Sequence, residues 1–305
     1  MIDESFHIPV LTEEVIHYLL LKKNGNYLDA TSGFGGHSAS ILEQLVGGSL
    51  ISTDQDPEAI SYLKSKFKSE ERLSIHQARF SELDKLLCDN DFDGILADIG
   101  VSSYQLNTAK RGFSFMKDGP LDMRMNQNIG EDASSWLNNA SEKEISNILW
   151  KYGEERKAKR IAKAIIEARK NFKIKSTKEL AEIILEEVPR RFNDKKHPAT
   201  KTFQAIRIFI NNELEELKLL LDFTSKHLKI GGRACIISFH SLEDRMVKQF
   251  FRDHSRRDPR LSKLPNLADD SSFKLVSKAI KPSDHEININ PRSRSAKLRV
   301  IERIR

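Results

Sequence analysis

The sequence is poor in cysteine and has no long apolar run. Its 305 residues include only two cysteines, Cys88 and Cys235, too few for a disulfide framework or a cysteine-based metal site. No apolar stretch approaches the roughly 20 residues of a membrane-spanning helix, and the first residues lack the basic and apolar regions of a signal peptide. We therefore expect a globular, cytoplasmic protein with no metal and no membrane partner.

Charged side chains are abundant, and their sum is slightly positive. Lysine and arginine number 50 against 44 acidic residues, a formal net charge of +6. Such a charge fits a polyanionic partner without requiring one, so its distribution decides. On the helix predicted from Arg156 onwards, Lys159, Arg160 and Lys163 point away from the apolar stripe. This basic face is either an ordinary solvated surface or a phosphate-binding one, and the sequence favours neither.

A glycine-rich turn follows the first predicted strand. The run is Asp29-Ala30-Thr31-Ser32-Gly33-Phe34-Gly35-Gly36-His37, and a helix is predicted after it. Such a turn lets the main chain approach a ligand closely and directs N–H groups of the helix start toward it. Asp54, which ends the next predicted strand, stands where a doubly wound fold places a carboxylate on a ribose. The pattern predicts a site for a nucleoside-containing cofactor, although a plain tight turn would use the same glycines.

The identity of that cofactor is narrowed by the residue at position 38. A dinucleotide fingerprint has a third glycine there, and this chain has Ser38. The serine counts against NAD and a nicotinamide-dependent oxidoreductase, and it leaves room for S-adenosylmethionine (SAM), which has no pyrophosphate. A non-catalytic RNA-binding assembly factor is a further alternative, against which the pair of Asp54 and Asp98 argues.

Strands alternate with helices over the first hundred residues, which predicts an α/β fold with a mostly parallel sheet. Ligands of such sheets bind at the carboxyl ends of the strands. Gly35, Asp54, Phe80 and Asp98 all fall at that predicted edge. Phe80 could lie against an adenine there, or it could simply pack a helix onto the sheet.

Beyond Ser103 the strand signal almost disappears until about residue 200. We therefore predict a discontinuous sheet domain, 1–103 and 201–305, with an all-helical domain at 104–200 inserted into it. The sequence further predicts one long helix through Phe203 and Leu217, and a strand over 233–238. Ser241 is the expected cap of the helix that follows this strand.

Segments along nearly the whole chain resemble the RsmH/MraW family of bacterial small-subunit ribosomal RNA methyltransferases, which are SAM-dependent. The segments are His7-Ile8-Pro9-Val10-Leu11, Asp29 to Ser38, Asp98 to Gln105, Arg111 to Phe115, Gly119 to Met125, Tyr152 to Arg156, His197 to Thr200, Ile237 to Arg245 and Asn290 to Ser295. Mild departures are Ile99, where leucine is usual, and Lys201, where arginine is usual; a lysine there loses bidentate geometry.

The resemblance implies a class I SAM-dependent methyltransferase fold, Rossmann-like, with a helical RNA-recognition insertion. It implies methylation of the exocyclic N4 of one cytidine in the decoding region of 16S rRNA, within assembled small subunits. The cofactor contacts that it implies fall on Gly35, Gly36, His37, Asp54, Phe80, Asp98 and Gln105. His37 and Gln105 come from the resemblance alone.

For catalysis, Asp98 is the candidate acceptor of the proton lost by the cytosine amine, with the carbonyls of Ile99 and Gly100 beside it. His240 is a second candidate for the pocket, unless its side chain only orders its loop. The candidate RNA contacts are Lys159, Arg160, Lys163, Lys201, Arg292 and Arg294. No obligatory protein partner is evident, and the oligomeric state, a homodimer included, stays open.

Overall fold

The computed structural model describes residues 9–190, 197–255 and 271–305, so His7 and Ile8 of the first family segment lie outside the described residues. The chain divides into two compact units, Met1–Gly100 with Leu214–Arg305, and Val101–Glu213. These boundaries lie close to the expected junction at 103/104 and further from the one at 200/201. Among the described residues, no helix has the length and apolar character needed to cross a membrane.

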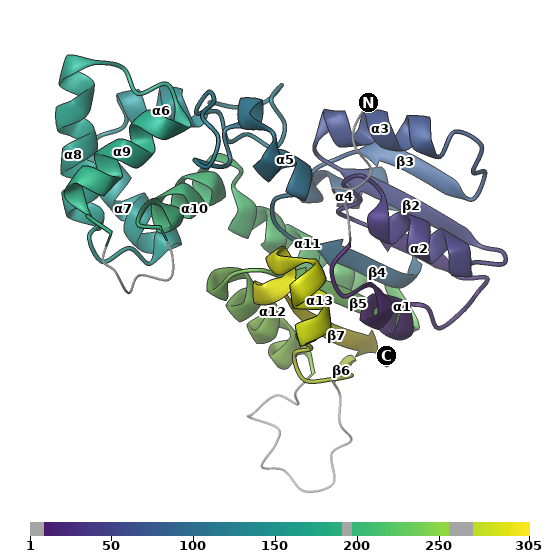
Figure 1. The fold of residues 1–305 in the computed structure, drawn as a ribbon. Coiled ribbons are helices and arrows are strands. Elements are labelled where there is room, and N and C mark those ends of the chain that lie inside the picture. Colours follow the sequence, from purple (N-terminus) through teal and green to yellow (C-terminus); the bar gives the residue numbers. More distant parts are fainter. Residues whose placement is uncertain (1–8, 191–196, 256–270) are drawn as a thin grey trace, which may run out of the picture. The chain divides into compact units, whose positions relative to one another are not determined.

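The first unit is built on one mixed sheet of seven strands (Figure 1). The strands are β1 (Asn26–Asp29), β2 (Ser49–Asp54), β3 (Leu73–Gln77), β4 (Phe92–Asp98), β5 (Leu228–Ser238), β6 (Phe273–Leu275) and β7 (Lys297–Arg303). Their order is β3-β2-β1-β4-β5-β7-β6. Strands β1 to β5 run parallel, and β7 runs antiparallel to both β5 and β6. The predicted Rossmann-like methyltransferase fold with a mostly parallel sheet is confirmed.

Helices cover both faces of this sheet. They are α1 (Thr12–Leu19), α2 (Gly36–Gln44), α3 (Pro57–Lys66), α4 (Leu83–Leu86), α11 (Glu213–His227), α12 (Ser241–His254) and α13 (Asp284–Ile289). Neighbouring residues of β4 enter opposite apolar layers: Ile95 packs with α11 through Phe223, and Leu96 packs with α2 through Ile41. A parallel strand that is buried on both faces carries such a continuous apolar run, and this run made β4 easy to predict.

The second unit is helical. Its helices are α5 (Ser103–Asn107), α6 (Ala133–Asn139), α7 (Glu142–Gly153), α8 (Ala158–Asn171), α9 (Thr177–Glu187) and α10 (Ala199–Ile210). Helix α8 buries Ile161 and Ile165 in a core that α10 completes with Phe203 and Ile206. Helix α10 therefore belongs to the helical unit, whereas the sequence placed residues 201–213 with the sheet. The described part of this unit contains only an isolated bridge, Pro120 to Ser176, as β structure.

The prediction of one long helix through Phe203 and Leu217 is wrong, because the helix is interrupted between α10 and α11. Asn212 has a left-handed backbone (φ 51°), a conformation that asparagine tolerates better than most residues. The Asn211 side chain donates to the Met123 carbonyl at 2.7 Å and accepts from the Met125 N–H at 2.7 Å. These bonds to a distant loop fix the end of α10.

Strand β5 also differs from its prediction, since it starts at Leu228 rather than at residue 233. Gly231 lies within the strand with φ 77°, and the pairing register with β4 shifts there. Gly231 and the adjacent Gly232 therefore mark an irregularity within the strand rather than its start.

Candidate active site

The candidate site lies where the strand order of the sheet reverses. Strand β1 is flanked by β2 on one side and β4 on the other. The chain leaves β3 at the edge of the sheet and returns to β4 beyond β1, so the strand order reverses between β1 and β4. Asp29 pairs in register with Leu96, which places the glycine turn after β1 next to Asp98 at the end of β4. Ligands of open α/β sheets bind in the crevice outside the carboxyl ends of the strands at such a point.

The glycine turn is anchored by the buried carboxyl group of Asp29, at the end of β1. Asp29 Oδ2 accepts from the Ser38 hydroxyl at 2.6 Å, and Oδ1 accepts from the Thr31 N–H at 3.2 Å. Burial raises the pKa of Asp29, and the hydrogen bond from Ser38 opposes that rise. The Ser38 hydroxyl also lies 2.9 Å from that of Ser52. Ser38 thus serves a buried carboxyl where a dinucleotide fold has its third glycine, a role that the sequence analysis missed.

Asp54 fastens the middle of the turn to the end of β2. Its Oδ2 accepts from the Gly33 N–H and its Oδ1 from the Asp56 N–H, each at 2.8 Å. Burial raises the pKa of Asp54 to about 6 despite these two bonds. Ser32 adds two hydrogen bonds to the Thr53 carbonyl, one from its N–H and one from its hydroxyl. Each carboxylate oxygen of Asp54 keeps a lone pair with which it can accept a hydrogen bond from a ligand hydroxyl.

Two glycines of the turn are required by space. Gly35 has φ 80°, and a Cβ there would lie 2.6 Å from Leu63 Cδ2 and 2.7 Å from Phe67 Cε2. At Gly36, the first residue of α2, a Cβ would lie 3.1 Å from the Cβ of Pro9. The absence of side chains at these positions lets the turn pack closely against α3 and the N-terminal segment.

His37 and Asp98 face each other across the strand ends. His37 is buried, and its Nε2 lies 3.6 Å from Asp98 Oδ2. Thr31 Oγ1 accepts from the Asp98 N–H at 2.6 Å, which fixes the end of β4. Three buried atoms have no hydrogen-bond partner within the described ranges: both ring nitrogens of His37 and Oδ1 of Asp98. Native proteins rarely leave buried polar atoms unsatisfied, so these three atoms have hydrogen-bonding capacity that a ligand could use.

Phe80 lies at the same edge, in a short 3-10 turn (Phe80–Glu82) after β3. Glu216 of α11 holds this turn by accepting from the Ser81 N–H at 2.9 Å and by pairing with Arg79 Nη2 at 2.9 Å. The Phe80 side chain is half-buried and packs against the apolar layer under α11. The packing role considered for Phe80 is therefore real, and a contact with adenine through its exposed part remains a prediction.

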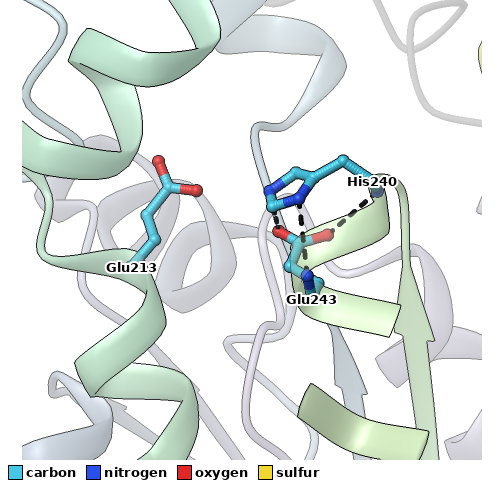
Figure 2. Close-up of side chains that lie close together, drawn as sticks. All are labelled: Glu213, His240 and Glu243. Carbon is cyan, nitrogen blue, oxygen red and sulfur yellow. Dashed lines mark hydrogen bonds and ion pairs between the residues drawn. The ribbon is translucent and has the colours of Figure 1, made fainter. Parts of the chain in front are cut away.

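His240 follows β5 at this edge of the sheet and caps α12 (Figure 2). Its Nδ1 accepts from the Glu243 N–H at 3.4 Å, and its Nε2 lies 2.9 Å from Glu243 Oε1. Buried Glu243 accepts in turn from the Phe239 N–H at 2.9 Å. The prediction that Ser241 caps this helix is wrong by one residue, because the cap is His240. His240 orders its loop, which is the second of the two roles considered for it.

Gln105 and four of the six candidate RNA contacts belong to the helical unit. Gln105 is buried and completes the capping box of α5 with Ser102. Lys159 and Lys163 are exposed on α8. Arg160 pairs with Glu187 at 2.6 Å, and Lys201 Nζ donates to the Glu154 carbonyl at 3.0 Å. Arg160 and Lys201 thus bind other residues of this unit, and contact of all four side chains with RNA stays a prediction.

The remaining two candidates, Arg292 and Arg294, lie in the first unit. Both are exposed in the 3-10 turn Pro291–Ser295 that precedes β7, and this turn is fixed by the buried Ser293. The Ser293 hydroxyl donates to the Asn290 carbonyl at 2.7 Å. The turn thus presents two arginines on a rigid support.

Comparisons with known proteins cover almost the whole chain. It is 49% identical over 305 residues to a ribosomal RNA small subunit methyltransferase H of Coxiella burnetii, covering 98% of this chain and 99% of that protein. The protein of the same name in Xanthomonas oryzae pv. oryzae is 48% identical over 300 residues, which are 98% of this chain and 89% of the relative.

Among solved structures, an rRNA methylase from Streptococcus thermophilus aligns over 100% of this chain and 99% of its own, with a TM-score of 0.41 and 12% identity. That likeness is too weak to support a statement about the site. The model of the MraW methylase family matches residues 4–304. The chain belongs to the MraW methylase family.

Proposed function

We propose that the protein transfers a methyl group from SAM to the exocyclic N4 of one cytidine in the decoding region of 16S rRNA, within the assembled small subunit. The proposal is supported above all by the buried, unpartnered polar atoms of His37 and Asp98 beside the glycine turn. Membership of a methylase family and relatives named for small-subunit ribosomal RNA agree with it.

The residues at the strand ends suit SAM. When bound, SAM supplies an electrophilic methyl group on its sulfonium. Asp54 would accept from the ribose hydroxyls, Phe80 would lie against the adenine, and the turn would bring main-chain atoms of Gly35 and Gly36 close to the methionine part. His37 and Asp98 would find polar partners there for their unsatisfied atoms. Gln105, which the family resemblance adds, completes the proposed set.

Asp98 is the group best placed to serve the methyl acceptor. The amino nitrogen of cytosine is a weak nucleophile because its lone pair is delocalised into the ring. A carboxylate oxygen that accepts a hydrogen bond from this amine favours a more tetrahedral nitrogen and can take the proton lost after transfer. Asp98 Oδ1 is buried without a partner in the described structure. The carbonyls of Ile99 and Gly100 follow Asp98 directly in the chain and are further candidate acceptors. Alignment of the methyl donor with the base can lower the activation barrier by roughly 7–11 kcal/mol.

RNA is the substrate that the basic surfaces suit. A base that reacts on its exocyclic nitrogen must leave its stack to enter a pocket. Lys159 and Lys163 on α8 would contact RNA phosphates, and so would Arg292 and Arg294 before β7. Binding of this kind weakens steeply as salt rises.

The decisive experiment uses small ribosomal subunits from cells that lack this protein. The subunits are incubated with the protein and labelled SAM, and the nucleosides of the recovered RNA are analysed by mass spectrometry. We expect N4-methylated cytidine at a single site of 16S rRNA. Label in another nucleoside, or none in the RNA, would contradict the proposed acceptor.

Asp98→Asn tests the catalytic role within the same assay. The amide keeps the size of the carboxyl group but cannot take up the proton, so we expect turnover to fall by about a hundredfold or more. Asp253→Asn, an exposed change on α12, is the matched control and should leave turnover unchanged. Near-normal turnover by the Asp98 variant would remove this carboxylate from the mechanism.

A further inference from the structure

A short N-terminal arm, Pro9–Leu11, lies against the glycine turn. A Cβ built on Gly36 would lie 3.1, 3.2 and 3.3 Å from the three side-chain carbons of Pro9. The Thr12 hydroxyl donates to the Pro9 carbonyl at 3.0 Å, which stiffens the arm where it enters α1. The Pro9 ring therefore supports the first residue of α2 from outside the turn.

The arm is held in an unusual backbone conformation. Leu11 has φ 54° and ψ 39°, and its side chain is fully buried in the apolar layer with α1 and α2. For a bulky residue the left-handed region is a genuine outlier, and it persists only where surrounding contacts enforce it. Such outliers gather at functional sites.

The contact that secures Leu11 comes from the other end of the sequence. The Leu11 N–H donates to Glu286 Oε1 at 2.8 Å, and these two residues are 275 positions apart. Glu286 lies on α13, where its own N–H donates to the capping Ser283 hydroxyl at 3.2 Å. Hydrogen bonds to a charged acceptor are shorter and stronger than neutral ones. Glu286 thus fastens the arm from a rigid helix.

We propose that Glu286 is a positioning residue for cofactor binding, which it promotes by holding Pro9–Leu11 against Gly36 so that the glycine turn is preformed. The inference rests on the proposed function, in which this turn binds SAM. Helix α13 runs directly into the turn that carries Arg292 and Arg294. The same segment therefore supports the cofactor site and presents the proposed RNA contacts.

Direct SAM binding to the purified full-length protein tests the inference without any RNA. Isothermal titration calorimetry is run at a temperature at which circular dichroism shows every variant to be folded. Glu286→Ala removes the acceptor, and we expect its Kd for SAM to rise about tenfold. Glu286→Gln keeps an amide oxygen that can accept from Leu11, so its Kd should stay within about twofold of the unchanged protein. In turnover, Glu286→Ala should raise KM for SAM and leave kcat at saturating SAM unchanged.

Two further variants make the test specific. Asp284→Ala removes an exposed carboxylate from the same helix and should leave the Kd unchanged. Pro9→Ala keeps the bond between Leu11 and Glu286 but removes most of the ring against Gly36, and it should also raise the Kd. Pro9→Ala decides the question if Glu286→Ala does not fold. Equal SAM binding by the arm variants and the unchanged protein would overturn the inference alone, whereas no SAM binding by the unchanged protein would overturn the proposed function as well.

Discussion

We expect the carboxyl group of Asp54 to give the proposed cofactor site a pH dependence. Burial raises its pKa to about 6 in the free protein. Ribose hydroxyls donate to the ionised form, so SAM binding would favour loss of this proton. We expect the affinity for SAM to rise between about pH 5 and pH 7 and then level off, because below the pKa each pH unit costs about tenfold. Calorimetric titrations across this range measure the effect, and an affinity that is flat from pH 5 to 7 would contradict it.

The raised pKa of Asp54 also makes the free energy of unfolding depend on pH. The folded protein holds a proton on Asp54 at pH values at which the unfolded chain, with its ordinary pKa, has lost it. The contribution of Asp54 to stability is therefore favourable below its unfolded pKa and is lost as pH rises to about 6.

At the residue scale, the two glycines Gly35 and Gly33 offer a matched pair. Both have positive φ, but a Cβ at Gly35 would meet Leu63 and Phe67. Among the described residues, no atom beyond the immediate chain neighbours lies within 4 Å of a Cβ at Gly33. We expect Gly35→Ala to lower the free energy of unfolding by about 2–4 kcal/mol, from backbone strain and overpacking together. Gly33→Ala should cost about 1 kcal/mol, from backbone strain alone. Urea denaturation of both variants measures the difference, and equal losses would argue against the packing contribution.

At the scale of the element, α8 carries the prediction for RNA binding. Lys159 and Lys163 are exposed on it, one turn apart, while Arg160 is engaged with Glu187. We expect the double change Lys159→Ala and Lys163→Ala to weaken binding to small subunits. The slope of log affinity against log salt should fall by about 1 to 2, because each lysine that contacts a phosphate contributes roughly one released counterion.

Lys143 provides the control for this measurement. It is an exposed lysine at the start of α7, outside the predicted RNA contacts. Filter-binding titrations over a range of salt concentrations should show no change of slope for Lys143→Ala. An unchanged slope for the double variant would mean that α8 faces solvent in the complex.

The elements of the sheet could be predicted because their signals are local. The apolar run of β4 and the glycines after β1 place Asp98 and the turn at one edge without any knowledge of distant contacts. What escaped prediction depends on partners far away in the sequence. Asn211 ends α10 through bonds to the loop at Met123, and Glu286 secures Leu11 from the opposite end of the chain. Hydrophobic periodicity carries no information about either pairing.

The residues of the candidate site divide in the same way, into those with a local sequence signal and those that depend on distant contacts. Residue type and spacing predict Gly35, Asp54 and Asp98 as site residues, and the structure brings the turn and both carboxylates together at the strand ends. In the sequence Ser38 stands only for a missing glycine, because its bond to Asp29 forms only when α2 packs over β1. The cap at His240 was assigned to Ser241, since a hydroxyl is the commoner capping group.

At the scale of the whole molecule, Asp93 ties together the amino end of the sheet, opposite the candidate site. It accepts from Lys22 at 2.7 Å, from the Asn26 N–H at 3.0 Å and from Lys229 at 3.0 Å. Burial alone would raise the pKa of Asp93, but these three donors outweigh it and lower the pKa to about 2. The group therefore stabilises the fold above its unfolded pKa, and this contribution is lost as pH falls from about 4 to about 2.

Asp93→Asn tests this link. The amide cannot pair with two ammonium groups, so we expect a loss of about 2 kcal/mol in the free energy of unfolding at pH 7. The loss should shrink as pH falls toward 2, where about half of the folded molecules carry a protonated Asp93. Denaturation curves at several pH values measure both trends, and a loss that does not depend on pH would contradict the electrostatic origin.

The insertion of Val101–Glu213 between β4 and β5 has a consequence for folding during synthesis. Once β4 has left the ribosome, its free edge must wait for β5 until the whole helical unit has been translated, a delay on the order of ten seconds. The helical unit is continuous in sequence, and α10, which completes its core, is the last of its helices to be translated. The open edge of β4 is apolar and unpaired for as long, which is the state most prone to join another chain. Nascent chains stalled within the insertion should accordingly bind chaperones that recognise unfolded chains more strongly than the completed protein does.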